Sequence, residues 1–281
     1  AHFDRTRHHH VLIDLQPTHD ATAHRLYALA EETVDASGLD DAQLLHRLRS
    51  LDLDVLIDLA VHSTANRIAV LAERVAPLQL CWLDYFDTTG LPAMDAWITD
   101  PWLTPMASTQ RYSERVVRLA SGRFCYTPMD DSPAPCRVGE STIVFGSFSR
   151  LAKLNEQVLD VWAEILHRSP SAQLELRARL LGDADNRARL VARFDARGID
   201  AERLRLGGAL SYPELLAAYQ RIDIALDPFP FSGCTKTCDA LWMGCPTITL
   251  TGDTFVSRQS ASLLWRLGRD EWVARDGADY I

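Results

Sequence analysis

The sequence predicts an α/β fold of the doubly wound type, built as two lobes with parallel sheets. Three observations support this prediction. Apolar strand-like runs alternate with segments of helical periodicity along most of the chain, which is typical of strand–helix–strand units. The alternation fails once, in a stretch near residues 121–140 that is rich in Pro, Ser and Asp. The 281 residues suffice for two domains of ordinary size.

The first half begins with a short strand and then a stretch of helical spacing, Ala21–Val34, with Leu26 and Leu29 on one stripe. A second helix is predicted over Asp40–Leu51, with its N-cap at Asp40 or Asp41. The run DVLIDLA indicates a strand that is buried on both faces. The predicted strands are Val11–Leu15, Asp54–Ala60, Leu78–Leu83 and Ala96–Thr99, and a third helix is predicted over Asn66–Val75.

The second half repeats the alternation more regularly. Its predicted strands are Thr142–Phe148, Gln173–Arg177, Arg203–Leu206, Ile222–Leu226 and Thr247–Leu250. Its predicted helices are Glu156–Arg168, Asp185–Arg197, Tyr212–Gln220, Thr235–Met243 and Ser257–Leu267. We therefore predict an N-terminal lobe over residues 1–122, a linker over 123–140 and a C-terminal lobe over 141–281. The sequence starts and stops abruptly, and we expect it to be a piece of a longer protein.

Composition excludes some classes of function. The net charge of −9 and pI near 5.4 argue against wholesale binding to nucleic acid or to an anionic membrane surface. No apolar run approaches the roughly 20 residues that span a bilayer, and residues 1–7 lack the apolar core of a signal peptide. The six cysteines follow no framework pattern and are expected to be reduced thiols of a cytoplasmic protein.

The stretch DPFPFSGCTKTCDALWMG follows a predicted strand and opens a predicted helix. A helix N-terminus with a close-approach glycine, Gly233, and donors on Thr235, Lys236 and Thr237 suits a diphosphate. Asp239 in the first turn is suited to accept hydrogen bonds from a ribose. The alternative is an ordinary loop with a threonine N-cap and an aspartate that complements the helix dipole.

A second candidate is FGSFSRLAKLNE, where Arg150 and Lys153 follow another strand and could clamp the same diphosphate. Solvated surface charge is the alternative. A metal site is not predicted: the triplet His8–His10 has no second ligand cluster, and the spacing of Cys234, Cys238 and Cys245 matches no common zinc pattern. A Rossmann oxidoreductase is disfavoured because no G-x-G-x-x-G follows the first strand.

Four ordered motifs carry a resemblance to a known family. IVFGSFSRLAKLNEQVLDVWAEIL, IDIALDPFPFSGCTKTCDALWMGCPTITL, GDTFVSRQSASLL and APLQLCWLDYFDTTGLPAMDAWITD together resemble the catalytic region of protein O-linked N-acetylglucosamine transferases, including Spindly-like bacterial members. The resemblance covers roughly Asp54–Gly268. It implies a GT-B fold, in which two Rossmann-like lobes face a cleft that holds the nucleotide sugar.

The resemblance also implies an activity, namely inverting transfer of N-acetylglucosamine from UDP-GlcNAc to Ser or Thr hydroxyls of proteins, with UDP as product and no obligate metal. Tetratricopeptide repeats that present the acceptor are expected in the full-length protein. UDP-glucose or GDP-fucose are alternative donors. A catalytically inactive nucleotide-sugar-binding module is the alternative from another class. The chain is expected to lack an N-terminal strand and a C-terminal helix of the catalytic unit.

By the same resemblance, Lys153 contacts the diphosphate and offsets the charge of the departing UDP, Asp239 binds the ribose, and Arg150 lies near the donor. The implied phosphate-loop positions are Gly233, Cys234, Thr235 and Lys236. His62 is implied to face the cleft from the N-terminal lobe, where a neutral imidazole is suited to act as base. An ordinary loop histidine is the alternative.

The turn Thr88–Gly90 is a further candidate to line the cleft. The sequence departs from the family at several positions. Leu215 stands where a histidine commonly stacks on uracil, and Tyr212 stands where a lysine commonly binds the ribose. Asp84 and Asp87 replace glycines of the N-lobe loop. These differences concern the identity of the donor more than the fold.

Overall fold

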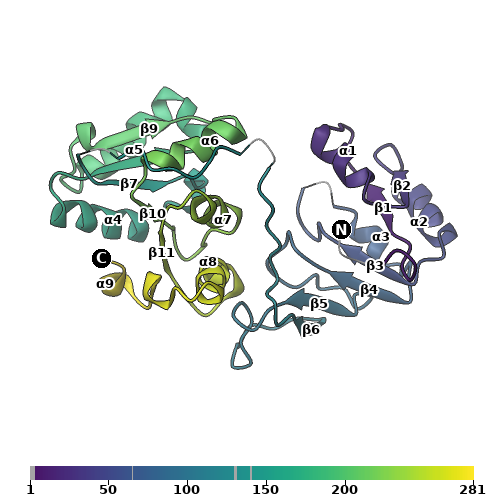
Figure 1. Cartoon of the computed structure of the whole chain (residues 1–281). Helices are drawn as coiled ribbons and strands as arrows, with labels where there is room; N and C mark the ends of the chain where they lie inside the picture. Colours follow the sequence, from purple (N-terminus) through teal and green to yellow (C-terminus); the bar gives the residue numbers. More distant parts are fainter. Residues whose placement is uncertain (1–3, 65, 130–131, 140) are drawn as a thin grey trace. The chain divides into compact units, whose positions relative to one another are not determined.

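A computed structural model describes residues 4–64, 66–129, 132–139 and 141–281 (Figure 1). By contact, the chain separates into two compact units. The first unit comprises Ala1–Thr99 and Arg111–Val117, and the second comprises Asp100–Gln110 and Arg118–Ile281. Within the described residues no helix is long and apolar enough to cross a membrane.

The segment 100–110 leaves the first unit and packs with the second, although the sequence predicts it within the N-terminal lobe. Two contacts within the second unit explain this. The Ser262 hydroxyl donates to the buried carboxylate of Asp100 at 3.1 Å, and Arg258 Nε donates to the carbonyl of Trp102 at 2.6 Å. Local periodicity carries no signal for such an excursion. Residues 130, 131 and 140 of the predicted linker lie outside the described residues.

The first unit contains, in its described part, two sheets of order β1–β2 and β3–β4–β5–β6. The pairs β1–β2, β3–β4 and β4–β5 are parallel. Its strands are β1 (Val11–Asp14), β2 (Glu32–Asp35), β3 (Val55–Asp58), β4 (Leu78–Cys81), β5 (Ala96–Thr99) and β6 (Arg115–Arg118). Its helices are α1 (Ala21–Tyr27), α2 (Asp41–Ser50) and α3 (Ile68–Leu71).

The long helix predicted over residues 21–34 is wrong in its second half. Helix α1 ends at Tyr27, and β2 then pairs in parallel with β1, so that Thr33 lies beside Leu12 and Val34 beside Ile13. Two β-branched residues in a row favour the pleated conformation, and pairing with a neighbouring strand outweighs the helical spacing. The sequence also gave no prediction for β6.

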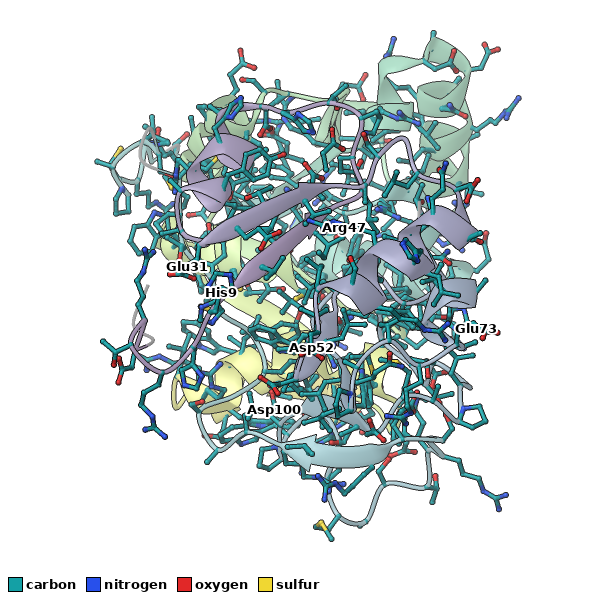
Figure 2. The ribbon with its side chains drawn as sticks, turned by 90° about the vertical axis from the view of Figure 1, so that its right-hand side faces the viewer. His9, Glu31, Arg47, Asp52, Glu73 and Asp100 are labelled. Carbon is teal, nitrogen blue, oxygen red and sulfur yellow. The ribbon has the colours of Figure 1, made fainter. Side chains whose placement is uncertain are left out.

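Helix α2 confirms its prediction and organises the core of the first unit. Asp40 caps it through a capping box with Gln43. Its buried Leu44 and Leu48 belong to a cluster that also includes Ile13 of β1 and Leu56 of β3, so one helix packs against both sheets. Charged side chains such as Arg47 and Glu73 lie on the surface of this unit (Figure 2).

The second unit contains a six-stranded sheet of order β12–β11–β10–β7–β8–β9, whose pairs are all parallel. Its strands are β7 (Val144–Ser147), β8 (Gln173–Arg177), β9 (Leu204–Gly207), β10 (Ile224–Leu226), β11 (Thr247–Leu250) and β12 (Val273–Ala274). Its helices are α4 (Glu156–Arg168), α5 (Ala184–Asp195), α6 (Tyr212–Ala218), α7 (Thr235–Trp242), α8 (Phe255–Arg266) and α9 (Gly277–Tyr280). Short 3-10 turns, including Leu151–Lys153, connect them.

The strand order reverses direction between β7 and β10. From β7 the chain builds outward through β8 to β9, and it then returns to β10 and builds the other way through β11 to β12. Ligands of doubly wound sheets bind at such a switch point, outside the carboxyl ends of the strands. The loops that follow β7 and β10 are therefore the place to look for a site (Figure 1).

Helix α4 shows why the sequence predicts this unit well. Its bounds match the prediction, and Asn155 caps it by accepting a hydrogen bond from the backbone N–H of Val158. Leu159 and Trp162 are fully buried in a core that also contains Leu174 of β8. The bounds predicted for β8 and β11 also match the structure.

Candidate active site

The two loops at the switch point carry the cations and small residues that the sequence singles out. The carboxyl ends of β7 and β10 lie side by side because these strands pair in parallel, with Phe145 beside Ile224. The loop after β7 carries Arg150 and Lys153, and the loop after β10 carries Gly233 and leads into α7. The structure joins them directly, since Lys153 Nζ donates to the carbonyl of Ser232 at 2.7 Å.

The Lys153 ammonium lies in a partly buried setting. Its Nζ is 4.1 Å from the centre of the Phe231 ring, a cation–π contact. Burial lowers the pKa of Lys153, and the nearby Asp227 carboxyl opposes this by raising it. The ammonium has three N–H donors, of which Ser232 accepts one. This arrangement presents a positive charge at the carboxyl end of the sheet, where a dry environment strengthens its attraction for an anion.

Arg150, the other predicted cation of this loop, is exposed. It lies near enough to Lys153 for its charge to lower the pKa of that lysine. The two predicted cations are thus neighbours, and Lys153 is the one that donates to the loop after β10.

Asp227 is a buried acid that the sequence reasoning did not single out. Its Oδ1 accepts the backbone N–H of Gly233 at 2.6 Å, and its Oδ2 accepts the Thr249 hydroxyl at 2.6 Å. A Cβ on Gly233 would lie 2.8 Å from Asp227 Oδ1 and 2.5 Å from Thr237 Oγ1, so glycine is required by this close approach. Burial raises the pKa of Asp227. The signal available in the sequence was an acid that ends a buried strand directly before the loop.

Helix α7 starts at Thr235, with Cys234 as its N-cap. The Cys234 side chain makes no capping hydrogen bond, so the first N–H groups of the helix are not satisfied by that residue. Thr235 is exposed at this end, whereas the Thr237 hydroxyl pairs with Ser260 Oγ at 2.7 Å in the interior. Burial raises the pKa of the Cys234 thiol, so it stays protonated at neutral pH. Thr235 and the helix N-terminus therefore remain the predicted phosphate-binding groups, while Thr237 serves packing.

Asp239, the predicted ribose acid, is the centre of a network. Its side chain is 0% exposed. Oδ1 accepts the hydroxyls of Tyr212 at 2.6 Å and Tyr126 at 3.0 Å, and Oδ2 accepts Lys236 Nζ at 3.1 Å. Burial raises the pKa of Tyr212 to about 12, so its hydroxyl is a donor at neutral pH. A ribose hydroxyl that binds Asp239 must exchange with one of these donors.

The structure therefore brings the candidate residues Tyr212, Lys236 and Asp239 together, and adds Tyr126. That tyrosine comes from the predicted linker, where local pattern gives no structural signal. Leu215, on the same helix as Tyr212, packs against the apolar cluster that contains Leu216 and Tyr219. The position thus carries a partly buried aliphatic side chain.

His62 belongs to the first unit, whereas Lys153 belongs to the second. His62 Nε2 lies 2.9 Å from the carbonyl oxygen of Thr89, and its ring meets Tyr85 edge-on at 5.1 Å between centres. Because a carbonyl oxygen only accepts hydrogen bonds, Nε2 is the donor, and a neutral ring then carries its lone pair on Nδ1. The predicted turn Thr88–Gly90 thus contacts the predicted base, and Gly90 adopts a left-handed φ of 72°.

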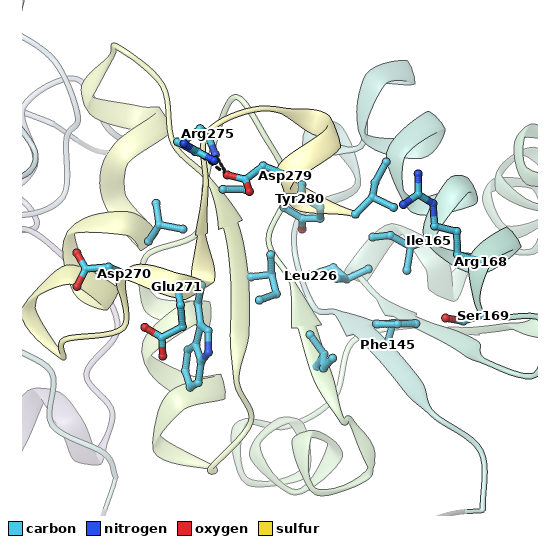
Figure 3. Close-up of a pocket in the computed structure, with 16 residues that line it drawn as sticks. Phe145, Ile165, Arg168, Ser169, Leu226, Asp270, Glu271, Arg275, Asp279 and Tyr280 are labelled. Atoms are coloured by element: carbon cyan, nitrogen blue, oxygen red, sulfur yellow. Dashed lines mark hydrogen bonds and ion pairs between the residues drawn. The ribbon is translucent and has the colours of Figure 1, made fainter.

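The second unit also has a hollow of about 580 Å³ that none of the predicted site residues lines (Figure 3). Its wall includes Phe145, Leu226 and Tyr280, and Arg275 pairs with Asp279 at its rim. The Tyr280 hydroxyl donates to the carbonyl of Asp227 at 2.9 Å. This hydrogen bond, and the contact of the Tyr280 ring with the Phe229 ring at 5.5 Å between centres, connect the hollow to the loop after β10.

Comparison with known proteins defines the class first. The fold matches a solved O-GlcNAc transferase point mutant from Thermobaculum terrenum, with a TM-score of 0.94 and 39% identity over 99% of this chain and 53% of that chain. The α/β GT-B class predicted from the sequence is confirmed by this match, and the class of protein is a glycosyltransferase. The family described as Glycosyl transferase family 41 matches residues 4–127 and 132–281 of this chain. The chain therefore belongs to this family.

Curated relatives agree with this assignment. The chain is 35% identical over 252 residues to a probable UDP-N-acetylglucosamine–peptide N-acetylglucosaminyltransferase SPINDLY of Petunia hybrida, and 33% identical over 251 residues to the Arabidopsis thaliana protein of that name. These alignments cover 88% of this chain but 27% and 28% of the relatives. The predicted resemblance to Spindly-like O-GlcNAc transferases is confirmed. The roles of individual site residues stay predictions.

Proposed function

We propose that this chain contains the donor-binding and catalytic region of a protein O-glycosyltransferase, which transfers N-acetylglucosamine from UDP-GlcNAc to Ser or Thr hydroxyls with inversion. The observation that carries the proposal is the direct contact between Lys153 and the loop that leads into α7. A positive side chain and a helix N-terminus converge there on the space outside the switch point, which suits a diphosphate. The names of the relatives support the choice of donor and reaction.

In the proposed reaction, the acceptor hydroxyl oxygen attacks the anomeric carbon from the face opposite the diphosphate. A new carbon–oxygen bond forms as the bond from the anomeric carbon to the β-phosphate oxygen breaks, and the electron pair leaves with UDP. Lys153 and the first N–H groups of α7 stabilise the negative charge that develops on the leaving group. These groups supply the positive charge, so the proposal requires no obligate metal.

The proton of the acceptor hydroxyl goes to a base, for which we propose His62 through Nδ1. Asp239 holds the ribose in this proposal after exchange with Tyr212 or Tyr126, whose hydroxyls already hydrogen-bond its carboxylate. The acceptor is presented by other parts of a longer protein, where tetratricopeptide repeats are expected. The cytoplasm remains the expected compartment.

A second donor deserves a test because of two residues. Leu215 offers no ring to stack on a base, and it is partly buried against an apolar cluster of the second unit. Tyr212, on the same helix, carries an aromatic ring beside Lys236. These two residues make GDP-fucose the alternative donor within the same reaction class, and UDP-glucose, which shares the uracil of UDP-GlcNAc, is the alternative that changes only the sugar.

The experiment is a calorimetric titration of the chain with UDP, GDP, UDP-GlcNAc, UDP-glucose and GDP-fucose, followed by a transfer assay on a Ser/Thr peptide. Preferential binding of UDP and UDP-GlcNAc, with transfer of N-acetylglucosamine, supports the proposal. Preference for GDP and GDP-fucose replaces the donor. Binding of a nucleotide sugar without transfer by the full-length protein contradicts the enzymatic proposal and favours a binding module.

A further inference from the structure

Glu114 is a buried acid of the first unit. Glu114 is 5% exposed. It lies in the segment 111–117, where the chain returns to the first unit after segment 100–110, which packs with the second. Glu114 Oε1 accepts the backbone N–H of Thr89 at 2.6 Å and also the Thr89 hydroxyl. Glu114 Oε2 accepts the Thr88 hydroxyl at 2.8 Å. One carboxylate thus holds two consecutive residues of the turn by three hydrogen bonds.

The same turn orients His62. Thr89 uses its N–H and hydroxyl toward Glu114 and its carbonyl toward His62 Nε2, at 2.9 Å. The N–H that Glu114 holds and the carbonyl that faces His62 belong to the same residue, Thr89, so a shift of the turn moves the acceptor of the imidazole. Without that acceptor the ring is no longer held in the tautomer with its lone pair on Nδ1.

The backbone on the other side of His62 is also fixed. Asp58, at the end of β3, accepts the backbone N–H of Val61 at 2.6 Å. Val61 is buried and has a left-handed φ of 47°, which is costly for a β-branched residue and is tolerated where the surroundings impose it. His62 is therefore held from the chain side by Asp58 and from the ring side by Thr89.

We propose that Glu114 is a positioning residue for the base of this enzyme: through Thr89 it fixes the orientation and tautomer of His62. The effect of Glu114 on catalysis rests on the proposed function, in which His62 is the base. The orientation of the His62 ring by Thr89 does not depend on that function. Glu114 does not touch the substrate in this proposal.

The test uses a double-mutant cycle in the full chain. Glu114→Ala lowers kcat by roughly 10² when it misplaces the base, with the donor KM unchanged within about twofold. Glu114→Gln, which keeps the shape and the acceptor oxygen, restores kcat to within about fivefold of wild type. In a His62→Ala background, Glu114→Ala has no further effect beyond about twofold, because both act on one step.

The matched control is Glu73→Ala, since the Glu73 side chain is 63% exposed on the surface of the same unit (Figure 2). It leaves kcat unchanged. Thr89→Val, which removes one hydroxyl donor, is the milder variant if Glu114→Ala does not fold; it lowers kcat in the wild-type background only. If Glu114→Ala lowers kcat equally with and without His62, the coupling is absent and the proposal is overturned.

A second readout does not need activity. Nitrogen chemical shifts of the His62 imidazole report which nitrogen carries the proton. Wild type and Glu73→Ala show a protonated Nε2 and an unprotonated Nδ1, whereas Glu114→Ala shows a mixture of tautomers. Unchanged shifts in Glu114→Ala overturn the positioning role. If wild-type protein transfers no sugar, the proposed function fails while this measurement still decides about Glu114.

Discussion

The two units both combine parallel strands with helices, but they differ in how the strands are joined into sheets. In the second unit six parallel strands form one sheet, and the central β7 and β10 are buried beneath helices. In the described part of the first unit the strands divide into a pair and a group of four. Val55, Ile57 and Leu59 of the β3 region are about half exposed, beside an apolar hollow of about 500 Å³ that β1 also lines.

This difference indicates how each unit positions its candidate site residues. The central strand β7 of the second unit is buried on both faces, so the site stands on a rigid sheet whose loops converge at a switch point. In the first unit, Asp58 holds the backbone N–H of Val61 directly before His62, and the His62 ring contacts the carbonyl of Thr89, which Glu114 anchors. We therefore expect mutations at the switch point of the second unit to act on donor binding and on the charge of the leaving group. Mutations at the polar contacts around His62 in the first unit are expected to act on the base.

The largest expected effect is that of Lys153→Ala, which tests whether the second unit supplies the charge for the leaving group. Turnover is expected to fall by roughly 10³, in line with removal of a charge-stabilising group from a transition state. The fold stays intact because the ammonium is at the edge of the core. Steady-state transfer kinetics measure the effect. Arg275→Ala, which removes an 84% exposed side chain of the same unit, is the control and keeps wild-type turnover. Equal turnover in Lys153→Ala and wild type would remove Lys153 from the mechanism.

The next effect compares two leucines. Leu159 is 0% exposed in the core of the second unit, and Leu59 is 51% exposed in the first. Leu159→Ala is expected to lower the free energy of unfolding by about 3 kcal/mol, because it leaves a cavity among tightly packed neighbours. Leu59→Ala is expected to cost less than about 1 kcal/mol. Urea denaturation monitored by hydrogen exchange in each unit separates the two. A similar loss in both variants would mean that the hollow beside β3 is closed in solution.

The smallest effect is on pH dependence. Arg74 binds Asp95 through two hydrogen bonds of 2.9 Å, which hold the pKa of Asp95 at about 2, below its ordinary value of 3.8. Between these two pKa values the unfolded chain binds more protons than the folded one, so this contribution is present above the higher pKa and is lost as the pH falls through the lower. Asp95→Asn is expected to reduce the dependence on pH of the free energy of unfolding of the first unit in acid. Denaturation experiments between pH 2 and 5, a range set around these two pKa values, measure this dependence. If the free energy of unfolding changes with pH equally in Asp95→Asn and wild type, the lowered pKa of Asp95 is contradicted.

Burial of Asp227 in the second unit acts with the opposite sign. Its raised pKa means that the folded state holds the proton more tightly than the unfolded chain. This contribution favours folding at low pH and is lost as the pH rises through the folded-state pKa. Acid is therefore expected to weaken the first unit through Asp95 while Asp227 acts in the opposite direction in the second.

The parts of the fold that local pattern specifies were predictable. Helix α4 and strands β8 and β11 follow from apolar periodicity and capping, and their bounds match. The loops after β7 and β10 were found because cations and a glycine follow buried strands. Strand β2 was missed because pairing with β1 stabilises its extended conformation. A prediction from the local sequence of residues 32–35 does not include β1.

The site residues that were missed share one property. Asp227, Tyr126 and Glu114 act on residues that are distant in sequence, such as Asp239 for Tyr126 and Thr89 for Glu114. A buried acid that ends a strand, or a tyrosine in a segment without periodicity, has the same local appearance whether or not it meets such a partner. Only the fold distinguishes them.

The two ammonium groups of the candidate site have a practical consequence. Lys153 and Lys236 are the only lysines in the sequence; arginine supplies every other fixed positive side chain. Both lie in the loops and first helical turn at the switch point, one bonded to Ser232 and the other to Asp239. A reagent that acylates primary amines therefore modifies side chains of this chain at the candidate site and nowhere else. The difference in acylated mass of this chain with and without nucleotide then counts how many of these two side-chain amines the nucleotide shields, because the α-amino group contributes equally to both.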